Sequence, residues 1–192
     1  MRVIAGKYRS RPLRSLSGMD IRPTSDRLRE TLFNVLTAGN VAALEGSVWL
    51  DLFAGTGAVG IEALSRGAKE VFFVENSKPA AEMIRQNLKA LGVVQGFHIH
   101  QEELPRAFWR MERERVTADV VFLDPPYHLK PAYANTLRAL AESSLVWPMS
   151  LVIAEHEKQF DPGEEFGALR RFRHLVQGSA ALSFYRLAGA RG

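Results

Sequence analysis

The chain has 192 residues, 46% of them hydrophobic, and a formal net charge of +4. This length predicts one domain that can bury enough surface to fold without disulfides or metals. The chain contains no cysteine, which excludes disulfide scaffolds, cysteine-ligated metal sites, iron–sulfur clusters and thiol nucleophiles. The apolar runs are too short to span a membrane, and the first residues lack the layout of a signal peptide. We therefore expect a soluble, cytoplasmic protein.

The first 29 residues carry the excess positive charge. They hold eight basic and two acidic side chains, so this segment is +6 and the remainder of the chain is −2. A basic arm on a nearly neutral body is typical of a protein that binds a polyanion, although a solvated tail is an equal alternative. An aromatic ring among the basic side chains can stack on a base. The residues predicted to contact such a substrate are Arg2, Lys7, Tyr8, Arg9, Arg11, Arg22 and Arg27.

In chain order, the pattern predicts an arm or small hairpin over residues 1–24, followed by a domain over residues 25–192. Ser25 is a typical N-cap, and the apolar spacing after it predicts a helix over 26–37. Strands and helices then alternate. Strands are expected at 47–52, 70–75, 96–100, 118–123 and 150–155, and helices at 57–66, 78–91, 102–113 and 131–144.

The last two expected strands, 171–176 and 180–187, are joined by a turn with no room for a crossover helix. They must therefore pair antiparallel. Apolar strands separated by amphipathic helices predict a parallel sheet with helices on both faces. The sequence thus predicts an α/β, Rossmann-like fold, with a seven-stranded, mostly parallel sheet closed by an antiparallel C-terminal hairpin.

A glycine-rich loop follows the first central strand. The pattern G-x-G-x-x-G occurs at Gly55, Gly57 and Gly60, where glycines permit a tight turn and the close approach of a ligand to a helix N-terminus. Glu75 ends the next strand, where a carboxylate can accept hydrogen bonds from a ribose diol. These features fit a nicotinamide dinucleotide or an adenosyl cofactor, and the glycine pattern alone does not choose between them.

Asp51, on the strand before the loop, favours a cofactor with a positive group, because a pyrophosphate would repel a carboxylate. S-adenosylmethionine carries an ammonium and a sulfonium and has no phosphate. The alternative role for Asp51 is to cap the strand end by bonding loop amides. The residues predicted to bind the cofactor are Asp51, Phe53, Ala54, Gly55, Thr56, Gly57, Glu75, Asn76 and Glu102.

The strand at 118–123 ends in a tetrapeptide that predicts the catalytic centre. In an open α/β sheet, ligands bind outside the carboxyl ends of the strands. Two prolines hold the backbone extended and leave carbonyls without local partners. A carboxylate and a proline carbonyl can then accept both hydrogens of an exocyclic amine, and a tyrosine ring can stack on the base. The predicted catalytic residues are Asp124, Pro125, Pro126 and Tyr127.

These motifs carry a family resemblance. The segment Asp51–Gly60, followed by Asp124–Tyr127, resembles the amino-methylating branch of the class I S-adenosylmethionine-dependent methyltransferases. The segments Arg2–Arg9 and Arg22–Asn34, with Ser183–Arg186 in the closing hairpin, are similar to bacterial 16S rRNA guanine-N2 methyltransferases of the RsmD type. The resemblance covers nearly the whole chain.

The resemblance implies the Rossmann-like class I methyltransferase fold, S-adenosyl-L-methionine as cofactor, and 16S rRNA in the small ribosomal subunit or its assembly intermediate as partner. The implied reaction is methylation of the N2 amine of the guanine at position 966 of 16S rRNA. The protein is expected to be a monomer without a metal ion or a membrane partner. Many members carry Asp or Asn after the third strand, whereas this chain reads Gln101-Glu102-Glu103.

Three alternatives stay open on the sequence. The tetrapeptide also suits other planar amines, such as adenine N6 in DNA or RNA, or a protein glutamine. A nicotinamide-dependent dehydrogenase would explain the glycines and Glu75, but would leave Asp51 and the tetrapeptide unused. A non-catalytic RNA-binding assembly factor would leave the intact motifs without a purpose.

A few further residues have competing interpretations. Glu155-His156-Glu157 ends a strand at the same edge of the sheet, and we expect solvent exposure rather than a place in the pocket. His98 and His100 alternate on a strand and so face one side, where a structural or surface role is favoured over metal binding. Trp49, Trp109 and Trp147 are expected to be core or helix-packing residues.

Overall fold

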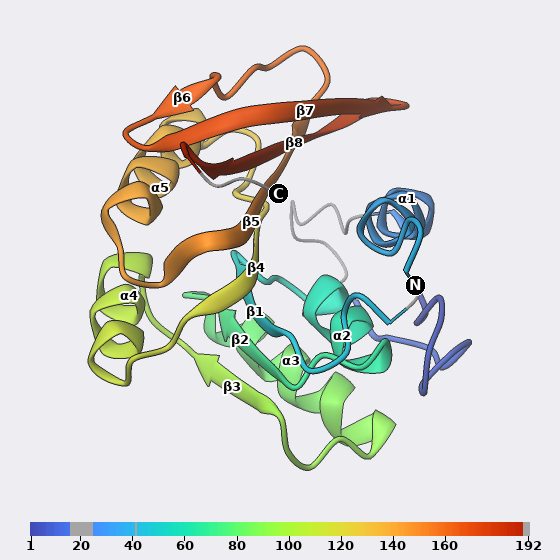
Figure 1. Cartoon of the computed structure of the whole chain (residues 1–192). Coiled ribbons are helices and arrows are strands. Elements are labelled where there is room, and N and C mark those ends of the chain that lie inside the picture. Colours follow the sequence, from blue (N-terminus) through green and yellow to red (C-terminus); the bar gives the residue numbers. More distant parts are fainter. Residues whose placement is uncertain (16–24, 41, 190–192) are drawn as a thin grey trace. The chain divides into compact units, whose positions relative to one another are not determined.

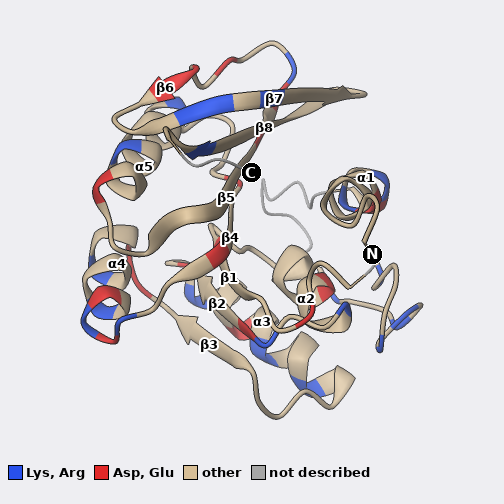
Figure 2. Ribbon diagram, in the orientation of Figure 1, with Lys and Arg blue, Asp and Glu red and all other residues tan. Residues whose placement is uncertain are grey.

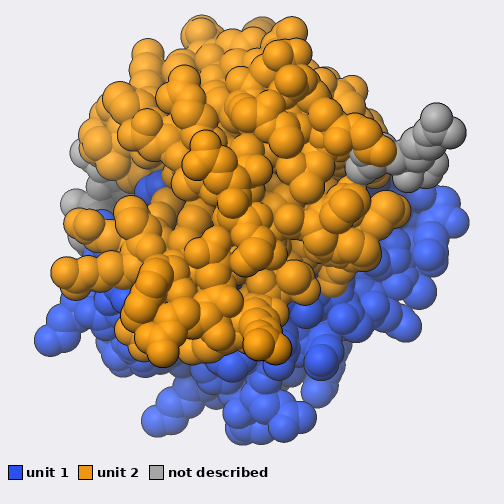
Figure 3. Space-filling model, turned by 60° about the vertical axis from the view of Figure 1, so that its left-hand side comes forward, with its two compact units in different colours: residues 1–102 blue, residues 103–192 orange. Residues whose placement is uncertain are grey.

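The computed structural model describes residues 1–15, 25–40 and 42–189 (Figure 1). The chain forms two compact units, Met1–Glu102 and Glu103–Gly192, which Figure 3 colours separately. The described residues of the arm belong to the first unit, and the domain boundary expected after residue 24 stays a prediction. Within the described ranges, every helix is too short or too polar to cross a membrane.

The first unit contains three parallel strands in the order β3-β2-β1. Leu50 lies opposite Phe72, which in turn lies opposite His98. Strands β1 and β2 are almost wholly buried, and helix α2 packs against both of them. This burial explains why their sequences are continuously apolar. The elements of this unit are α1 (Asp26–Leu36), β1 (Val48–Leu52), α2 (Ala58–Ser65), β2 (Glu70–Val74), α3 (Lys78–Leu91) and β3 (Phe97–His100).

Helix α1 begins where its N-cap predicts. The Ser25 side chain accepts a hydrogen bond from the backbone N–H of Leu28 at 3.1 Å. Leu32 and Phe33 are fully buried, and the Phe33 ring stacks on Trp49 of β1 with centroids 5.4 Å apart. Burying an aromatic side chain of this size contributes about 1.5–3 kcal/mol. The apolar face of α1 therefore docks on β1.

Residues 1–15 form a small hairpin, one of the two predicted forms. Arg2 and Pro12 make an antiparallel bridge, and the backbone N–H of Leu13 donates to the Met1 carbonyl at 3.0 Å. Val3 is 1% exposed and Leu13 is 6% exposed. The arm is therefore packed into the first unit, and its backbone is not a solvated tail.

The second unit contains the remaining strands in the order β4-β5-β8-β7-β6. Strand β5 runs parallel to β4 and antiparallel to β8, and β7 and β8 form the predicted closing hairpin. Helix α5 packs against β5, β6 and β7. The elements of this unit are α4 (Leu104–Arg113), β4 (Ala118–Leu123), α5 (Lys130–Glu142), β5 (Val146–Glu157), β6 (Glu165–Phe166), β7 (Leu169–Gln177) and β8 (Ala180–Leu187).

Two expectations need correction. The described residues form eight strands rather than seven, because Glu165–Phe166 pairs with the start of β7. A strand of two residues is too short to show an alternating pattern. Trp109 is 60% exposed and Trp147 is 40% exposed, so a core position is wrong for these two, whereas Trp49 is fully buried.

Candidate active site

The glycine loop adopts the tight turn that its sequence predicts. The backbone φ is positive at Phe53 (59°), Gly55 (55°) and Gly57 (75°). Glycine tolerates this conformation, whereas a residue with a Cβ such as Phe53 pays roughly 1–2 kcal/mol for it. The Gly57 N–H donates to the Ala54 carbonyl at 2.7 Å and closes the turn. Helix α2 starts directly after it, so the loop leads into a helix N-terminus.

The third glycine of the motif serves packing. A Cβ on Gly60 would lie 2.4 Å from Cε1 of Phe73 and 2.7 Å from Cγ1 of Val71. It would also lie 2.9 Å from Oδ2 of Asp51. Only a residue without a side chain lets α2 approach β2 this closely.

Two carboxylates hold the loop at its two ends. Asp51 is 2% exposed, and its Oδ2 accepts the backbone N–H of Gly60 at 2.8 Å. Burial raises the pKa of Asp51 to about 7, against the effect of that hydrogen bond and with a smaller contribution from the charge of Glu75. Glu75 accepts the N–H of Gly55 on Oε2 and the N–H of Ser77 on Oε1, both at 2.8 Å. Burial also raises the pKa of Glu75.

The two carboxylates restrict the kind of cofactor that fits beside the loop. Two acidic groups beside one loop disfavour a pyrophosphate, and a buried carboxylate with a raised pKa is stabilised in its charged form by a nearby cation. The Glu75 oxygens keep lone pairs for the hydroxyls of a ribose. The residues present therefore fit a cofactor with cationic and diol groups and no phosphate. Asp51 also caps a backbone amide, which is the alternative role expected for it, although this amide belongs to Gly60 in the first turn of α2.

Asn87 of α3, which the sequence analysis missed, connects the carbonyl of Thr56 in the loop to the arm. Thr56 is 4% exposed, and its carbonyl accepts from Nδ2 of Asn87 on α3 at 3.1 Å. The same amide group bonds the backbone of Arg14 in both directions, at 2.8 and 3.2 Å. An asparagine in an amphipathic helix has no local signal for such a role.

The remaining predicted cofactor residues lie at the ends of β2 and β3. Asn76 is exposed. Oε1 of Glu102 lies 3.4 Å from Nδ1 of His100. The other ring nitrogen of His100 is buried and has no hydrogen-bond partner among the described residues. The rings of His98 and His100 both stack on Phe72, with centroids 4.4 and 6.1 Å away. In the described ranges, no group of three or more His, Asp or Glu side chains is arranged to hold a metal ion.

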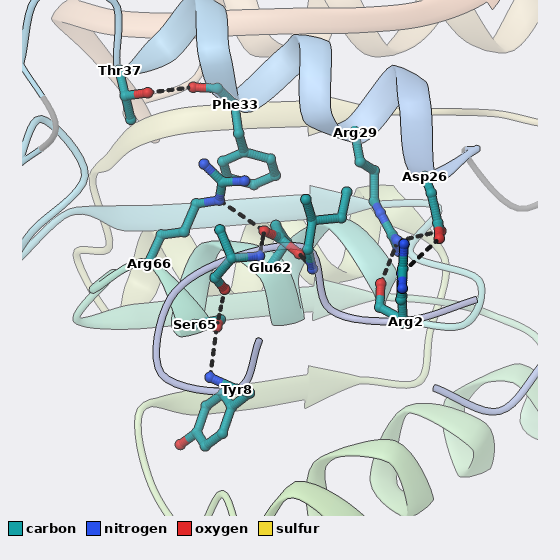
Figure 4. Close-up of polar contacts among 11 residues, drawn as sticks. Arg2, Tyr8, Asp26, Arg29, Phe33, Thr37, Glu62, Ser65 and Arg66 are labelled. Atoms are coloured by element: carbon teal, nitrogen blue, oxygen red, sulfur yellow. Dashed lines mark hydrogen bonds and ion pairs between the residues drawn. The ribbon is translucent and has the colours of Figure 1, made fainter. Parts of the chain in front are cut away.

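The arm is held on α2 by a buried carboxylate. Glu62 is 0% exposed, and it accepts the backbone N–H of Ile4 at 2.7 Å and that of Ala5 at 3.0 Å (Figure 4). Ser65 adds to this contact, because its hydroxyl oxygen accepts the N–H of Tyr8 at 2.9 Å. The path of the arm is thus set by backbone contacts, and these contacts leave its basic side chains exposed.

Lys and Arg residues recur along the arm, where Figure 2 colours the ribbon blue, and they are exposed. Lys7 and Arg9 are exposed and have no ion-pair partner among the described residues. Arg11 and Arg14 are exposed too, but each reaches α3, where Arg11 donates to the Ala90 carbonyl at 3.1 Å. Nζ of Lys7 lies 5.4 Å from the Tyr8 ring centroid.

A cavity of about 400 Å³ lies between the arm and α1. Three residues predicted to bind substrate line it, namely Arg2, Arg9 and Arg27. Beside it, the buried guanidinium of Arg29 donates to the Arg2 carbonyl at 2.6 Å and to Asp26 at 2.7 Å (Figure 4). The sequence analysis missed Arg29, because a basic residue in a helix normally predicts exposure. Arg22 lies outside the described residues.

The tetrapeptide of the second unit follows β4 directly. Pro125 is buried, Pro126 is exposed, and Asp124 and Tyr127 are partly exposed. The expectation that both proline carbonyls lack local partners is wrong. The hydroxyl of Tyr133 donates to the Pro125 carbonyl at 3.2 Å, and the N–H of Leu129 donates to the Pro126 carbonyl at 2.7 Å. Each carbonyl keeps a second lone pair, so Pro125 can still accept from a ligand.

Tyr133 of α5 is the residue in this region that the sequence analysis missed. It is 1% exposed, and its ring lies 5.1 Å from that of Phe160. Burial, followed by the charge of Asp124, raises the pKa of Tyr133 far above its usual value. The hydroxyl is therefore a permanent donor at neutral pH. From sequence alone, Tyr133 looks like any core position of an amphipathic helix.

Two of the three residues at the end of β5 are buried, which corrects the expectation of solvent exposure, whereas Glu157 is partly exposed. Glu155 is 4% exposed and His156 is 1% exposed. Nδ1 of His156 lies 2.9 Å from the Glu157 carbonyl, and Nε2 lies 2.9 Å from Oγ of Ser183. Burial lowers the pKa of His156, so its ring is neutral, with Nδ1–H donating to the carbonyl and Nε2 accepting from the serine.

Comparison with solved structures defines the class of protein. A candidate methyltransferase of Escherichia coli, yhhF, matches with a TM-score of 0.81 and 27% identity over 97% of each chain. A hypothetical protein of Thermus thermophilus matches with a TM-score of 0.80 and 27% identity, over 96% of this chain and 98% of that one. The fold is therefore that of the Rossmann-like class I methyltransferases, as expected.

Sequence comparison then places the chain in one family. The model described as Conserved hypothetical protein 95 matches residues 1–186. Ribosomal RNA small subunit methyltransferase D of Haemophilus influenzae is 40% identical over 82% of this chain and 79% of its own. A Bacillus subtilis relative described as an rRNA methyltransferase candidate, YlbH, is 31% identical over 98% of this chain and 100% of its own. The chain belongs to this family, which is the RsmD family, as the motifs indicate.

Proposed function

We propose that this protein transfers a methyl group from S-adenosyl-L-methionine to the N2 amine of guanine 966 in 16S rRNA of the small ribosomal subunit. The observation that carries the proposal is the combination of an acidic glycine loop with an amine-accepting tetrapeptide in a member of this family. The names of the relatives support rRNA as the substrate. Such a reaction takes place in the cytoplasm.

The first unit would hold the cofactor. Asp51 would stabilise its positive charge, and Glu75 would accept hydrogen bonds from its ribose hydroxyls while it continues to hold the Gly55 amide. Gly55 and Gly57, both at positive φ, let the chain turn tightly between β1 and α2, beside the two carboxylates. When bound, S-adenosylmethionine supplies an electrophilic methyl group on a sulfur that leaves readily.

The second unit would prepare the amine. The lone pair of a guanine N2 amine is delocalised into the ring, which makes the amine a poor nucleophile. If Asp124 and the Pro125 carbonyl accept hydrogen bonds from the two amine hydrogens, the nitrogen becomes more tetrahedral. Its growing positive charge is then stabilised. Asp124 then takes the proton after the transfer. The enzyme otherwise needs to align the amine with the methyl carbon at about 3–3.5 Å and to exclude water.

The target base must leave its stack, which costs a few kcal/mol. Stacking on Tyr127 would return about 1–3 kcal/mol. Phosphate contacts from Lys7, Arg9 and the arginines around the cavity beside α1 would contribute the rest. The arm is thus proposed as the RNA-binding surface of the enzyme.

The test is a methyl-transfer assay with tritiated S-adenosylmethionine on small subunits, naked rRNA and DNA, followed by mass spectrometry of the modified nucleoside. We expect N2-methylguanosine in the small-subunit rRNA. Asp124→Asn should lower the transfer rate at least 100-fold with nearly unchanged cofactor affinity. Asp119→Asn, at the other end of the same strand, is the matched control. N6-methyladenosine as the product would refute guanine as the substrate. Full activity of Asp124→Asn would refute the role given to Asp124.

A further inference from the structure

Glu155 is a buried carboxylate that the proposed mechanism does not use. It lies in β5, which runs parallel to β4 with Ala154 opposite Leu123. Asp124 and Glu155 are the next residues along the two strands. Because side chains alternate between the faces of a sheet, these two carboxylates extend from the same face, on neighbouring strands about 4.8 Å apart.

Tyr133 of α5 contacts the tetrapeptide through the Pro125 carbonyl. Its hydroxyl donates to that carbonyl at 3.2 Å. After burial, the charges of Asp124 and Glu155 are both among the causes that raise the pKa of Tyr133. The strand register places the two carboxylates on one face of the sheet. Three acceptors, namely the Asp124 carboxylate, the Pro125 carbonyl and the Glu155 carboxylate, therefore gather at one end of the second unit.

The surroundings of Glu155 on its own sheet differ from those of the next residue. Its position opposite on β8 is Leu182, which is fully buried and offers no polar group from its side chain. The side chain of His156 extends from the other face of β5 and is bonded to the Glu157 carbonyl and to Ser183. The titratable groups that act on Tyr133 together with Glu155 are Asp124, Tyr127 and Glu157.

The bases differ in what they would present to such a set of acceptors. Beside the N2 amine of guanine lies the ring N1–H, which is a second kind of donor on the Watson–Crick edge. Beside the N6 amine of adenine lies the ring N1 lone pair, which is an acceptor. A site that already holds an amine can therefore recognise guanine with one additional acceptor, and that same acceptor repels adenine.

We propose that Glu155 is a specificity-determining residue that accepts the N1–H of the target guanine while Asp124 and the Pro125 carbonyl hold its amine. This inference rests on the proposed function and goes further, because it names the atom that distinguishes guanine from other amines. A carboxylate has about four acceptor positions, so Glu155 can keep its contacts within the protein and still accept from the base.

The first experiment changes the base and keeps the protein intact. Small subunits are reconstituted with 16S rRNA that carries either guanine or 2-aminopurine at the target position. 2-Aminopurine has the same exocyclic amine, but its N1 is an acceptor. We expect the wild-type protein to methylate 2-aminopurine at least 100-fold more slowly, because a site built to accept an N–H rejects an analogue without it. Equal rates within threefold would overturn the inference.

The second experiment changes the side chain. In Glu155→Gln the amide can still accept from guanine, and it can also donate to N1 of 2-aminopurine. We expect the rate with guanine to fall about tenfold and the ratio of the guanine rate to the 2-aminopurine rate to fall at least 30-fold. Glu157→Gln, two residues along the same face of the strand, should keep the wild-type ratio. An unchanged ratio in Glu155→Gln would overturn the inference.

The experiments distinguish a wrong function from a wrong role for Glu155. If the wild-type protein methylates neither the small subunits that carry guanine at the target position nor naked rRNA, the proposed function is wrong. If it methylates guanine but the ratio does not depend on Glu155, the inference alone is wrong. Thermal unfolding and calorimetric binding of S-adenosylmethionine report whether Glu155→Gln is folded. Should it be unfolded, the comparison of the two bases in the wild-type protein decides.

Discussion

The carboxylate of Glu75 accepts the backbone N–H of Gly55 at 2.8 Å, across 20 residues of sequence. The residue expected to bind the ribose of the cofactor is thus also the residue that fixes the loop around it. Its second oxygen accepts the N–H of Ser77, which begins the turn into α3. A carboxylate engaged by two backbone amides is oriented before any ligand arrives, which lowers the entropic cost of binding.

The two roles of Glu75 can be separated by two substitutions. Glu75→Gln keeps an acceptor for the Gly55 amide but removes the charge, whereas Glu75→Ala removes both. We expect Glu75→Ala to weaken S-adenosylmethionine binding about 30-fold, which corresponds to about 2 kcal/mol, and Glu75→Gln to weaken it less. Calorimetric titration measures this, with Glu82→Ala on the exposed side of α3 as the control. Wild-type affinity in Glu75→Ala would move the ribose site elsewhere.

Asp51 predicts how the stability of the cofactor-free protein depends on pH. Its folded-state pKa is raised to about 7, whereas an exposed aspartate has a pKa near 3.8. Between these values the folded state holds a proton that the unfolded chain has released, so the contribution of Asp51 to the free energy of unfolding decreases as pH rises from about 4 to about 7. Above pH 7 it should change no further.

The measurement is urea unfolding of the wild-type protein and Asp51→Asn at pH 5.5, 7 and 8.5. The amide accepts the Gly60 N–H and has no charge to bury. We expect the variant to gain stability relative to the wild type as pH rises. A stability difference that stays constant over this range would show that Asp51 does not titrate as its burial implies.

Glu62 predicts how strongly the arm is attached. Its carboxylate is fully buried and bonds the amides of Ile4 and Ala5 as well as Nε of Arg66 at 2.8 Å. Removing one partner of a buried ion pair costs about 3–5 kcal/mol. We expect Glu62→Ala to lose stability of this order in urea unfolding and to become sensitive to trypsin in the arm. Glu45→Ala, which is exposed, should do neither. An uncleaved arm in Glu62→Ala would assign its attachment to the apolar residues.

The contribution of the arm to RNA binding is best tested by removing charge and not by truncation. Deleting the arm would also remove Val3 and Leu13 from the core. Lys7 and Arg9 are exposed, so Lys7→Gln and Arg9→Gln should leave the fold intact. Each lost phosphate contact should reduce the slope of log affinity against log salt by roughly 0.7 on single-stranded RNA.

Filter binding to 16S rRNA fragments at several salt concentrations gives this slope. Lys69→Gln, in the loop before β2, is the matched control and should leave the slope unchanged. If the double variant Lys7→Gln, Arg9→Gln keeps the wild-type slope, the arm is not part of the RNA interface. Its basic side chains would then be solvated only.

Local signals predict the elements of this protein well. The Ser25 cap and the apolar spacing after it predict a helix over 26–37, and α1 covers Asp26–Leu36. The strand expected at 118–123 is β4, Ala118–Leu123. These predictions succeed because capping, turn formation and hydrophobic periodicity depend on neighbours within a few residues. Strand β6 was missed for the same reason, since two residues show no period.

The same distinction between local and long-range interactions applies to the candidate site. The sequence by itself determined the tight turn of the glycine loop and the place of Asp124–Tyr127 directly after β4, because turn residues act on neighbours within a few positions. Only the tertiary structure decided that Glu62 bonds an amide 58 residues away and that the carboxylate of Glu155 is buried. Burial and long-range hydrogen bonds depend on which surfaces pack together, and two distant segments carry no mark of their pairing until the chain folds.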